Sequence, residues 1–368
     1  MNSTARTESF SAHRANNNAA AMARVDAWLR DNLPGLALAG AVAAASTQAA
    51  RLAWFAAHGI SSLTLAIVLG MLASGLHAAL PATRPGVGFA KARLLRLGIV
   101  LYGLRLTFQD IGQVGVAGVL IDAAVLSSTF LLATLLGTRF FGMDRTTAML
   151  IGAGSSICGA AAVLATEPVV RGKAEQVAVA IATVVVFGTA AIFVYPLIYQ
   201  LASAHFDVGL RAFGVYTGST VHEVAQVVAA GQNISQATAD TAVIAKMVRV
   251  MMLAPFLLAL SLYLARRAPA ESKVPGQRAP ITIPWFALGF VLMAGVNSLH
   301  VLPAAAVHTA IDADTTVLTM AMAALGLTTH PGAIRAAGLK PLALAGVLFA
   351  WLIGGGALIN VAAHALLG

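Results

Sequence analysis

Eleven long apolar runs, separated by short polar links, constrain this chain more than any other feature of its sequence. A helix of about 20 apolar residues crosses a hydrocarbon core roughly 30 Å thick. The runs lie at 33–52, 57–80, 92–110, 114–137, 146–168, 174–201, 210–230, 239–265, 282–300, 313–334 and 341–366. The pattern predicts an all-α membrane protein with about 11 transmembrane helices.

The scarcity of charge supports a lipid environment. Of the 368 residues, 59% are hydrophobic and 10% are charged, and the mean hydropathy is +0.83. Soluble domains carry about 25% charged residues. The net charge of +9 could suggest nucleic acid, but the basic residues are scattered between apolar runs instead of forming a phosphate-binding face. We therefore expect the lipid bilayer, and no nucleic acid, as the large-scale partner.

The basic residues predict the orientation of the chain. With a cytoplasmic N-terminus, the inner segments are the N-terminal tail, 81–93, 138–145, 202–211, 266–278 and 335–340. They hold Arg6, Arg14, Arg24, Arg30, Arg84, Lys91, Arg93, Arg139, Arg145, Arg211, Arg266, Arg267, Lys273, Arg278, Arg335 and Lys340. The outer segments hold Arg51, Arg171 and Lys173. By the positive-inside rule, the N-terminus is cytoplasmic and the C-terminus periplasmic.

The first 30 residues are polar and lack the apolar core of a secretory signal. We expect residues 1–30 to form a cytoplasmic tail, disordered over 1–23, and 33–52 to form an accessory transmembrane helix. Two repeat units then follow, helices 2–6 over 57–201 and helices 7–11 over 210–366.

Internal similarity suggests that these two units are inverted copies. Segment 151–188 resembles 325–356, because each breaks an apolar span with Gly, Ser or Thr and then has a short basic link. Segment 94–104 pairs with 247–257 and places Arg96 opposite Arg249. Inverted five-plus-five repeats with broken helices are typical of secondary transporters.

The first interruption contains Gly154, Ser155 and Ser156 within the stretch 152–159. Glycines weaken the helix, and a half-helix that starts near Ser156 would direct free N–H groups and a positive dipole end into the membrane. Such an end can bind a small oxyanion. The alternative is close packing of two helices through small residues.

The second interruption, 326–332, is predicted to be its counterpart. Pro331 suits the first position of a restarted half-helix, and Thr328 and Thr329 would contact the anion beside it. The alternative is that the helix ends here and Pro331 begins a loop.

A third group consists of His222, Glu223 and Gln226, within the apolar stretch 217–231. Ionisable groups inside a membrane are costly and usually line a cavity or a proton path, so we predict an ion-coupling role. The alternative is hydrogen bonding between helices. His222 and Glu223 lack the second histidine that a zinc-protease motif needs.

Arg96 and Arg249 are the predicted countercharges for an anion, because guanidinium binds oxyanions in bidentate fashion. The alternative is that each long side chain reaches the membrane interface. The sequence has no P-loop, no CxxC, no HExxH and no metal-ligand spacing. We therefore expect no enzymatic activity, no metal and no cofactor.

Five segments identify a family resemblance. LLRLGIVLYGLRLTF, IGAGSSICGAAAVLATEPVV, GSTVHEVAQVVAAG, KMVRVMMLAPFL and MAMAALGLTTH closely resemble the YeiH-like bacterial inner-membrane proteins, which carry the name sulfate exporter family. The resemblance runs from about residue 33 to the C-terminus. It implies a bacterial inner-membrane protein and a distant relation to the bile-acid-symporter type of fold, with crossing broken helices. Pro331 departs from the family pattern, where another residue is usual.

Together these features predict a secondary active transporter that exports a small anion, sulfate or a related sulfur oxyanion, coupled to H⁺ or Na⁺. Two alternatives stay open at this point. One is a cation/proton antiporter that uses Glu223 and Asp122, and the other is a membrane protein that binds a ligand without moving it. The oligomeric state is also open, with a homodimer among the options.

Overall fold

The computed structural model describes residues 4–52, 54–55, 60–267, 285–329 and 338–367. Within these ranges every regular element is a helix. The elements are α1 (Thr4–Ala50), α3 (Ser62–Leu72), α4 (Ser74–Ala79), η1 (Pro81–Thr83), α5 (Arg84–Phe89), η2 (Ala90–Leu94), α6 (Leu95–Tyr102), η3 (Gly103–Arg105), α7 (Phe108–Arg139), α8 (Arg145–Ser156), α9 (Ala160–Val170), α10 (Ala174–Ser203), α11 (Leu210–Thr220), α12 (Val224–Gln232), α13 (Gln236–Met251), α14 (Leu253–Arg267), α15 (Trp285–Ser298), α16 (Ala304–Leu327) and α18 (Leu339–Leu367).

Six helical segments in the described ranges are long and apolar enough to cross a membrane. They are Ala23–Ala50, Val114–Arg139, Glu175–Ser203, Gln236–Arg266, Ala304–Leu327 and Leu339–Leu366. Shorter apolar helices lie at Ser62–Leu72, Ala160–Val170 and Trp285–Ser298. The apolar runs predicted from sequence are therefore a mixture of full spans and shorter helical pieces.

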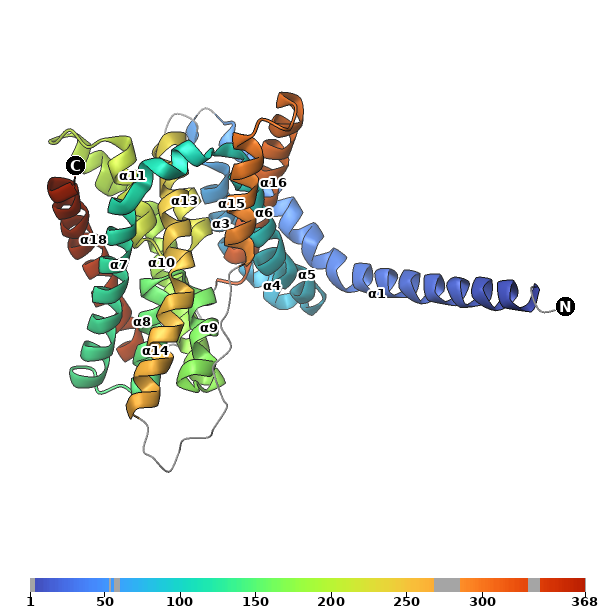
Figure 1. Cartoon of the computed structure of the whole chain (residues 1–368), viewed down its shortest axis with the longest axis horizontal. Helices are drawn as coiled ribbons and strands as arrows, with labels where there is room; N and C mark the ends of the chain where they lie inside the picture. Colours follow the sequence, from blue (N-terminus) through green and yellow to red (C-terminus); the bar gives the residue numbers. More distant parts are fainter. Residues whose placement is uncertain (1–3, 53, 56–59, 268–284, 330–337, 368) are drawn as a thin grey trace.

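The N-terminal segment differs from the expectation. Helix α1 is continuous from Thr4 to Ala50, with Pro34 inside it, so the predicted disordered tail is helical. In Figure 1 its N-terminal part projects far from the rest of the molecule. Its second half packs against η1 and α5, and an added Cβ at Gly35 would meet the carbonyl oxygen of Thr83 in η1 at 2.1 Å.

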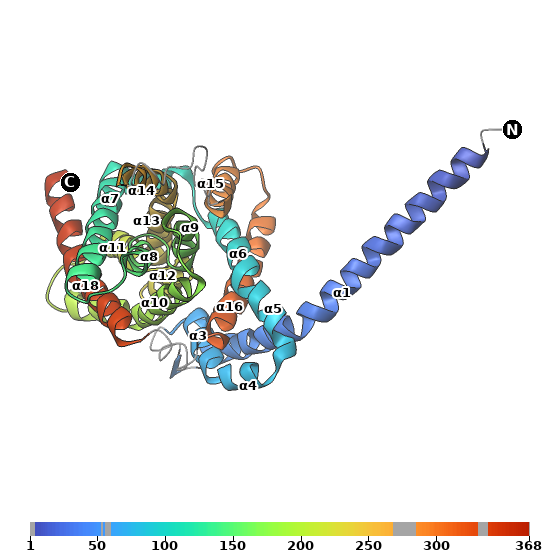
Figure 2. The same cartoon turned by 90° about the horizontal axis from the view of Figure 1, so that it is seen from below.

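The helices form two groups side by side (Figure 2). One group, which we call the core bundle, contains α7 to α14 and α18; the other, the flanking bundle, contains α1, α3 to α6, α15 and α16. Polar contacts join the two bundles. The Tyr102 hydroxyl donates to Asp240 Oδ1 at 2.9 Å, and Asn233 Oδ1 accepts from the Ser61 N–H at 3.0 Å.

Helices α8 and α9 form a hairpin that enters and leaves at the same end of the core bundle. Asp144 caps the start of α8 by accepting from the N–H groups of Thr146 and Thr147. Its Oδ2 also accepts from Gln176 Nε2 at 2.7 Å, in the first turn of α10. The predicted crossing of 146–168 is therefore wrong. The break after Ser156 reverses the chain. The end of α9 and the start of α10 therefore lie at the same end of the core bundle as the end of α7 and the start of α8 (Figure 1).

Helices α11 and α12 form a second hairpin, which enters from the opposite end (Figure 1). The Thr238 hydroxyl in the first turn of α13 donates to the carbonyl oxygen of Leu210, where α11 begins, at 3.3 Å. The prediction that 210–230 crosses the membrane is therefore also wrong, because the chain turns back between α11 and α12. Because α10 is a full span between the two hairpins, segment 202–211 lies at the end that holds the C-terminus, not at the opposite end as predicted (Figure 1).

Candidate functional site at the tips of two hairpins

The two hairpins turn on matching tetrapeptides. Helix α8 ends in Gly154-Ser155-Ser156-Ile157, and α11 ends in Gly218-Ser219-Thr220-Val221. In register, Ser155 corresponds to Ser219 and Ile157 to Val221. In both hairpins the second helix starts three residues after this tetrapeptide, at Ala160 and at Val224. The same short sequence thus ends the first helix of each hairpin.

Arg249 of α13 binds corresponding residues of the two tips. Its guanidinium donates from Nη2 to the carbonyl oxygen of Ser155 at 2.8 Å and from Nη1 to that of Ser219. A further bond runs from Nε to the carbonyl oxygen of Ser156 at 2.7 Å. Arg249 is fully buried, so these bonds form where water cannot compete with them.

Lys246, one helical turn earlier, repeats this pattern at the next corresponding pair. Its Nζ donates to the carbonyl oxygen of Ile157 at 2.6 Å and to that of Val221 at 2.8 Å. Lys246 is also fully buried. One helix of the core bundle therefore holds both tips with two adjacent cations (Figure 1 shows α13 beside both hairpins).

The chemistry of helix ends explains this arrangement. The last carbonyl groups of a helix have no partner within the helix, and the partial negative charge of the helix dipole is concentrated there. An unpaired buried carbonyl is costly in a membrane interior. Lys246 and Arg249 satisfy the carbonyls at the ends of α8 and α11, and the carbonyls in turn solvate two buried cations.

Glu223 joins the two tips directly. Its Oε1 accepts from the backbone N–H of Ala160, the first residue of α9, at 3.1 Å. A carboxylate is favourable at a helix N-terminus. Gly159 makes the approach possible: an added Cβ there would meet Glu223 Cγ at 2.3 Å, and its φ of +71° is unfavourable for other residues. The second hairpin thus places a carboxylate on the N-terminus of α9, the second helix of the first hairpin.

The other two members of the predicted ion-coupling group lie next to Glu223. Gln226 Oε1 accepts from the Glu223 N–H at 3.0 Å, and the amide packs closely against Gly188 of α10. His222 is buried and its ring lies 6.2 Å from that of Phe349. Neither His222 Nδ1 nor Gln226 Nε2 has a hydrogen-bond partner in the described part of the chain. His222 and Glu223 lie in the non-helical break between α11 and α12, whereas Gln226 lies in the first turn of α12.

The predicted serines are in the same place. Ser155 and Ser156 are buried at the end of α8. The Ser156 hydroxyl faces the carbonyl of Ala153 at 3.5 Å, whereas the Ser155 hydroxyl has no partner among the described residues. Gly154 packs closely, with Val184 and Val163 less than 3 Å from an added Cβ. The tip therefore combines tight packing with one buried hydroxyl, that of Ser155, which has no hydrogen-bond partner among the described residues.

Thr328 and Thr329 do not join this site. They lie at the end of α16 in the flanking bundle, where their hydroxyls donate to the carbonyl oxygen of Leu325. Thr328 Oγ1 also accepts from Lys91 Nζ at 3.2 Å. Helix α16 ends at Leu327, with Thr328 as its C-cap. The start of this segment therefore ends a helix as the end of α8 does, but its threonines lie in the flanking bundle and not beside Ser155 and Ser156. Its residues 330–332, with Pro331, lie outside the described residues.

Arg96 is also separate from Arg249. It lies on α6 of the flanking bundle and is exposed, whereas Arg249 is buried in the core bundle. The predicted correspondence of segments 94–104 and 247–257 therefore does not give equivalent environments. The countercharge role of each arginine stays a prediction.

Sequence reasoning missed the true partner of the first break. The signal was present as the tetrapeptides GSSI at 154–157 and GSTV at 218–221. The sequence gives no comparable signal for Lys246, because no sequence pattern shows that its amine reaches two carbonyl groups far away in the chain.

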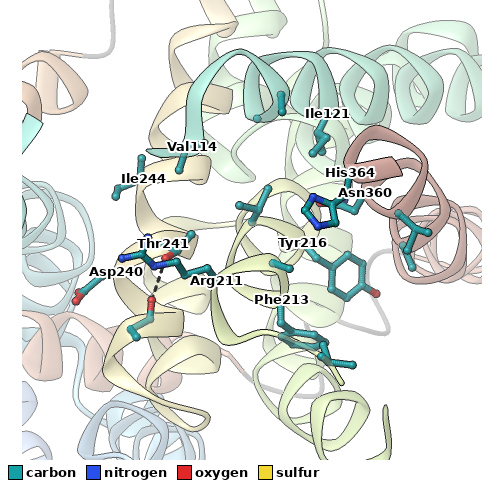
Figure 3. Close-up of a pocket in the computed structure, with 18 of the residues that line it drawn as sticks. Val114, Ile121, Arg211, Phe213, Tyr216, Asp240, Thr241, Ile244, Asn360 and His364 are labelled. Carbon is teal, nitrogen blue, oxygen red and sulfur yellow. Dashed lines mark hydrogen bonds between the residues drawn. The ribbon is translucent and has the colours of Figure 1, made fainter. Parts of the chain in front are cut away.

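A cavity of about 950 Å³ lies beside α11 and approaches this site. Its walls come from α7, α11, α13 and α18 and are mostly apolar (Figure 3). Asn360 in its lining donates to the Ser219 hydroxyl at 3.2 Å. Arg211, Asp240 and His364 also line it. The cavity thus extends toward the tip of the second hairpin.

The fold and site define a multi-pass membrane protein with two opposed hairpins whose tips meet inside the bundle. The family model described as "Conserved hypothetical protein 698" matches residues 34–345. The chain therefore belongs to this family, which includes the UPF0324 membrane proteins and YeiH.

Curated relatives cover almost the whole chain. The UPF0324 membrane protein PA5383 of Pseudomonas aeruginosa is 62% identical over 338 residues, 90% of this chain and 94% of the relative. The UPF0324 inner membrane protein YeiH of Escherichia coli K12 is 55% identical over 330 residues, 89% and 93% of the two chains. The UPF0324 membrane protein plu2856 of Photorhabdus laumondii is 53% identical over 343 residues, 91% and 94%. No solved structure matches. With its apolar helices, the chain is a multi-pass protein of the inner membrane.

Proposed function

We propose that this chain is a secondary active transporter of a small anion, with sulfate or a related sulfur oxyanion as the substrate to be exported. The observation that carries the proposal is the meeting of two broken hairpins inside the core bundle, held by Arg249 and Lys246. Non-helical backbone at membrane depth is tolerated where it is buried in protein or lines a cavity, and in secondary transporters such breaks form the substrate site.

The two hairpin units support an inverted repeat with a different boundary from the five-plus-five division. Helices α8, α9 and α10 form one unit, and α11, α12 and α13 with α14 form the other. Their hairpins enter from opposite ends (Figure 1), and their tips share the Gly-Ser-Ser/Thr-Ile/Val sequence. Two inverted units of this kind can expose one central site to either side in turn.

The distribution of basic residues supports an orientation. The end of α7, the start of α8, the end of α9 and the start of α10 lie together where the first hairpin enters (Figure 1). These helix ends carry or adjoin four basic residues, Arg139, Arg145, Arg171 and Lys173. We place this end in the cytoplasm by the positive-inside rule. The C-terminus is then periplasmic, and so is the end where the second hairpin enters.

The chemistry of the tips suggests how an anion binds. The unused hydroxyl of Ser155 and the N-terminus of α9 can both donate to an oxyanion. The Glu223 carboxylate now occupies that N-terminus. A substrate anion would compete with Glu223, so its binding would move this side chain and link substrate occupancy to the second hairpin. Coupling is to H⁺ or Na⁺.

Counterflow of radiolabelled sulfate in proteoliposomes tests the proposal. The wild-type chain should show saturable exchange, and Ser155→Ala should raise the KM for sulfate. Because the Ser155 hydroxyl has no hydrogen-bond partner in the described residues, this substitution removes no hydrogen bond from the protein without substrate. Ser127→Ala, at an exposed position of α7, is the matched control. Failure of the folded wild-type protein to exchange sulfate, sulfite or thiosulfate would overturn the sulfur-anion proposal.

A second candidate function is cation/proton antiport, favoured by two acids in the core bundle, Asp122 and Glu223. Counterflow of radiolabelled Na⁺ that is lost in Glu223→Gln, without any anion exchange, would support it. The two buried cations at the tips favour the anion transporter, because they would repel a bound metal ion.

A further inference from the structure

Asp122 is a buried acid that the proposed anion site does not use. It lies in the middle of α7 and is fully buried. Neither carboxylate oxygen has a hydrogen-bond partner among the described residues. Most buried polar groups in proteins are hydrogen-bonded, and an ionised carboxylate without a donor is especially costly. A carboxyl group in this position requires an explanation.

The charges that act on Asp122 belong to the cations that hold the hairpin tips. Within the described residues they are Arg249 and Lys246, both of α13. Helices α8, α11, α15 and α18 also pack against α7, and their charged or titratable residues are Arg145, Arg211, Tyr216, Lys340 and His364. The two cations direct their hydrogen bonds to the tip carbonyls. Asp122 therefore interacts with them through space and forms no ion pair or hydrogen bond with either.

The cavity beside α11 reaches the surroundings of this group. Ile121 and Ile244 line it, and in the sequence they come one residue before Asp122 and two before Lys246. Figure 3 shows both isoleucines at the cavity wall. Water in the cavity would therefore come near Asp122, although the carboxyl group itself is not exposed.

We infer that Asp122 is the proton acceptor of the transport cycle and that H⁺ is the coupling ion. This inference rests on the proposed anion transport. A proton from water in the cavity adds to one carboxylate oxygen and is later released from that oxygen to water on the other side of the membrane. Only an O–H bond forms and breaks, and no electrons are exchanged.

Charge balance links this proton to the anion. The formal charges of Lys246, Arg249, Asp122 and Glu223 cancel. A net charge buried in a low-dielectric interior is costly. Protonation of Asp122 adds one positive charge, which one negative charge of the substrate then balances. Anion and proton therefore move in the same direction. Export then requires an outward anion gradient large enough to carry the proton outward with the anion.

A proton fits the group better than Na⁺ does. A metal cation requires several oxygen ligands around it, whereas no polar group of the described residues is hydrogen-bonded to the Asp122 carboxylate. Lys246 and Arg249 would also repel it. A proton needs a single oxygen, and the neutral acid it forms leaves these two cations free to balance an anion.

Infrared difference spectroscopy of the purified full-length protein tests the protonation without requiring transport. The wild-type chain should show a carboxylic-acid C=O band that disappears at alkaline pH and is missing in Asp122→Asn. Asp312→Asn, on the exposed face of α16, should leave the band in place. A spectrum with no band specific to Asp122 at any pH would overturn the inference, whatever the substrate proves to be.

Sulfate transport in proteoliposomes tests the coupling. In the wild type an inward proton gradient should stimulate sulfate uptake. Asp122→Asn should keep sulfate counterflow and lose this stimulation, while Asp312→Asn should keep both. If gradient-driven uptake persists in Asp122→Asn, Asp122 does not carry the proton. If folded Asp122→Asn loses counterflow as well, the residue belongs to the anion site and the inference also fails.

A wild type without counterflow would disprove the proposed function. The infrared result would still decide whether Asp122 titrates. If Asp122→Asn does not fold, Asp122→Glu replaces it: its acid band should titrate at a shifted pH, and an unchanged titration would contradict the assignment.

Discussion

The carbonyl oxygens of Ile157 and Val221 accept hydrogen bonds from the same amine, Lys246 Nζ, at 2.6 and 2.8 Å. These two residues occupy the same position in two hairpins that enter from opposite ends of the core bundle (Figure 1). A single buried cation therefore fixes the relative position of the two breaks, and any movement of one hairpin against the other must change at least one of these bonds.

Replacing this amine should destabilise the protein strongly. Lys246→Met keeps most of the side-chain volume but removes the close donor of two buried carbonyl groups, each such bond being worth about 1–3 kcal/mol. The carbonyl of Val221 keeps a longer bond of 3.5 Å from Arg249 Nη1. We expect a loss of roughly 2–5 kcal/mol, seen as a lower thermal unfolding midpoint in detergent. Lys173→Met, at an exposed position, should change the midpoint little. Equal midpoints for the two variants would contradict the bracing role of Lys246.

Gly159 should tolerate no side chain. Gly159→Ala combines an unfavourable positive φ with a Cβ only 2.3 Å from Glu223 Cγ. Gly142→Ala is the matched control, because Gly142 has a φ of +58° but nothing lies within 4 Å of an added Cβ. Backbone strain in the control should lower the free energy of unfolding by about 1 kcal/mol, and Gly159→Ala should lower it clearly more. Similar unfolding midpoints would show that Glu223 is not tightly placed on the α9 N-terminus.

Gly188 should be needed for the position of Gln226. An added Cβ would meet Gln226 Oε1 at 2.1 Å, so Gly188→Ala must displace the amide that accepts from the Glu223 N–H. We expect a loss of about 1–3 kcal/mol and slower sulfate counterflow. Gly346→Ala introduces only an ordinary contact of 3.4 Å with Phe187 and serves as the control. Unchanged counterflow and stability in Gly188→Ala would show that the position of Gln226 does not matter for the site.

Cysteine labelling should reveal the reversal of the first hairpin. In a Cys158→Ser background, Arg139→Cys and Arg171→Cys flank α8 and α9 at exposed positions. An impermeant thiol reagent should reach both from the same side of the membrane, and Asp207→Cys from the other side. If 146–168 were a single span, the labels at 139 and 171 would appear on opposite sides instead.

The buried ion pair of the flanking bundle should matter for stability. Arg105 Nη2 lies 3.0 Å from Asp314 Oδ2, whose side chain is fully buried. Asp314→Asn leaves the Arg105 charge without its partner, and breaking a buried pair costs about 3–5 kcal/mol. Asp312→Asn changes an exposed carboxyl two residues earlier and should leave the unfolding midpoint unchanged. A midpoint in Asp314→Asn equal to that of this control would show that the pair contributes nothing.

Hydrophobicity determined much of the fold before any tertiary information. Long apolar runs can be stable only in lipid, so the helical class, the membrane environment and the six long apolar helices followed from composition. The glycines and serines of 152–159 marked a true break, because small residues weaken a helix locally. The polar residues His222, Glu223 and Gln226 marked the second tip, because such groups are rare inside a membrane.

The direction of the chain after each break depended on tertiary structure. Whether a half-helix continues across the membrane or turns back depends on which neighbours satisfy its freed carbonyls, and those donors, Lys246 and Arg249, are far away in sequence. The two reversals place 171–173 and 202–211 at the opposite ends of the core bundle from those that the basic-residue count predicted. The sides of the two chain termini stay a prediction. The pairing of Ser155 with Ser219 was likewise decided by contacts to α13, because apolar helices look alike on their lipid-facing and protein-facing sides.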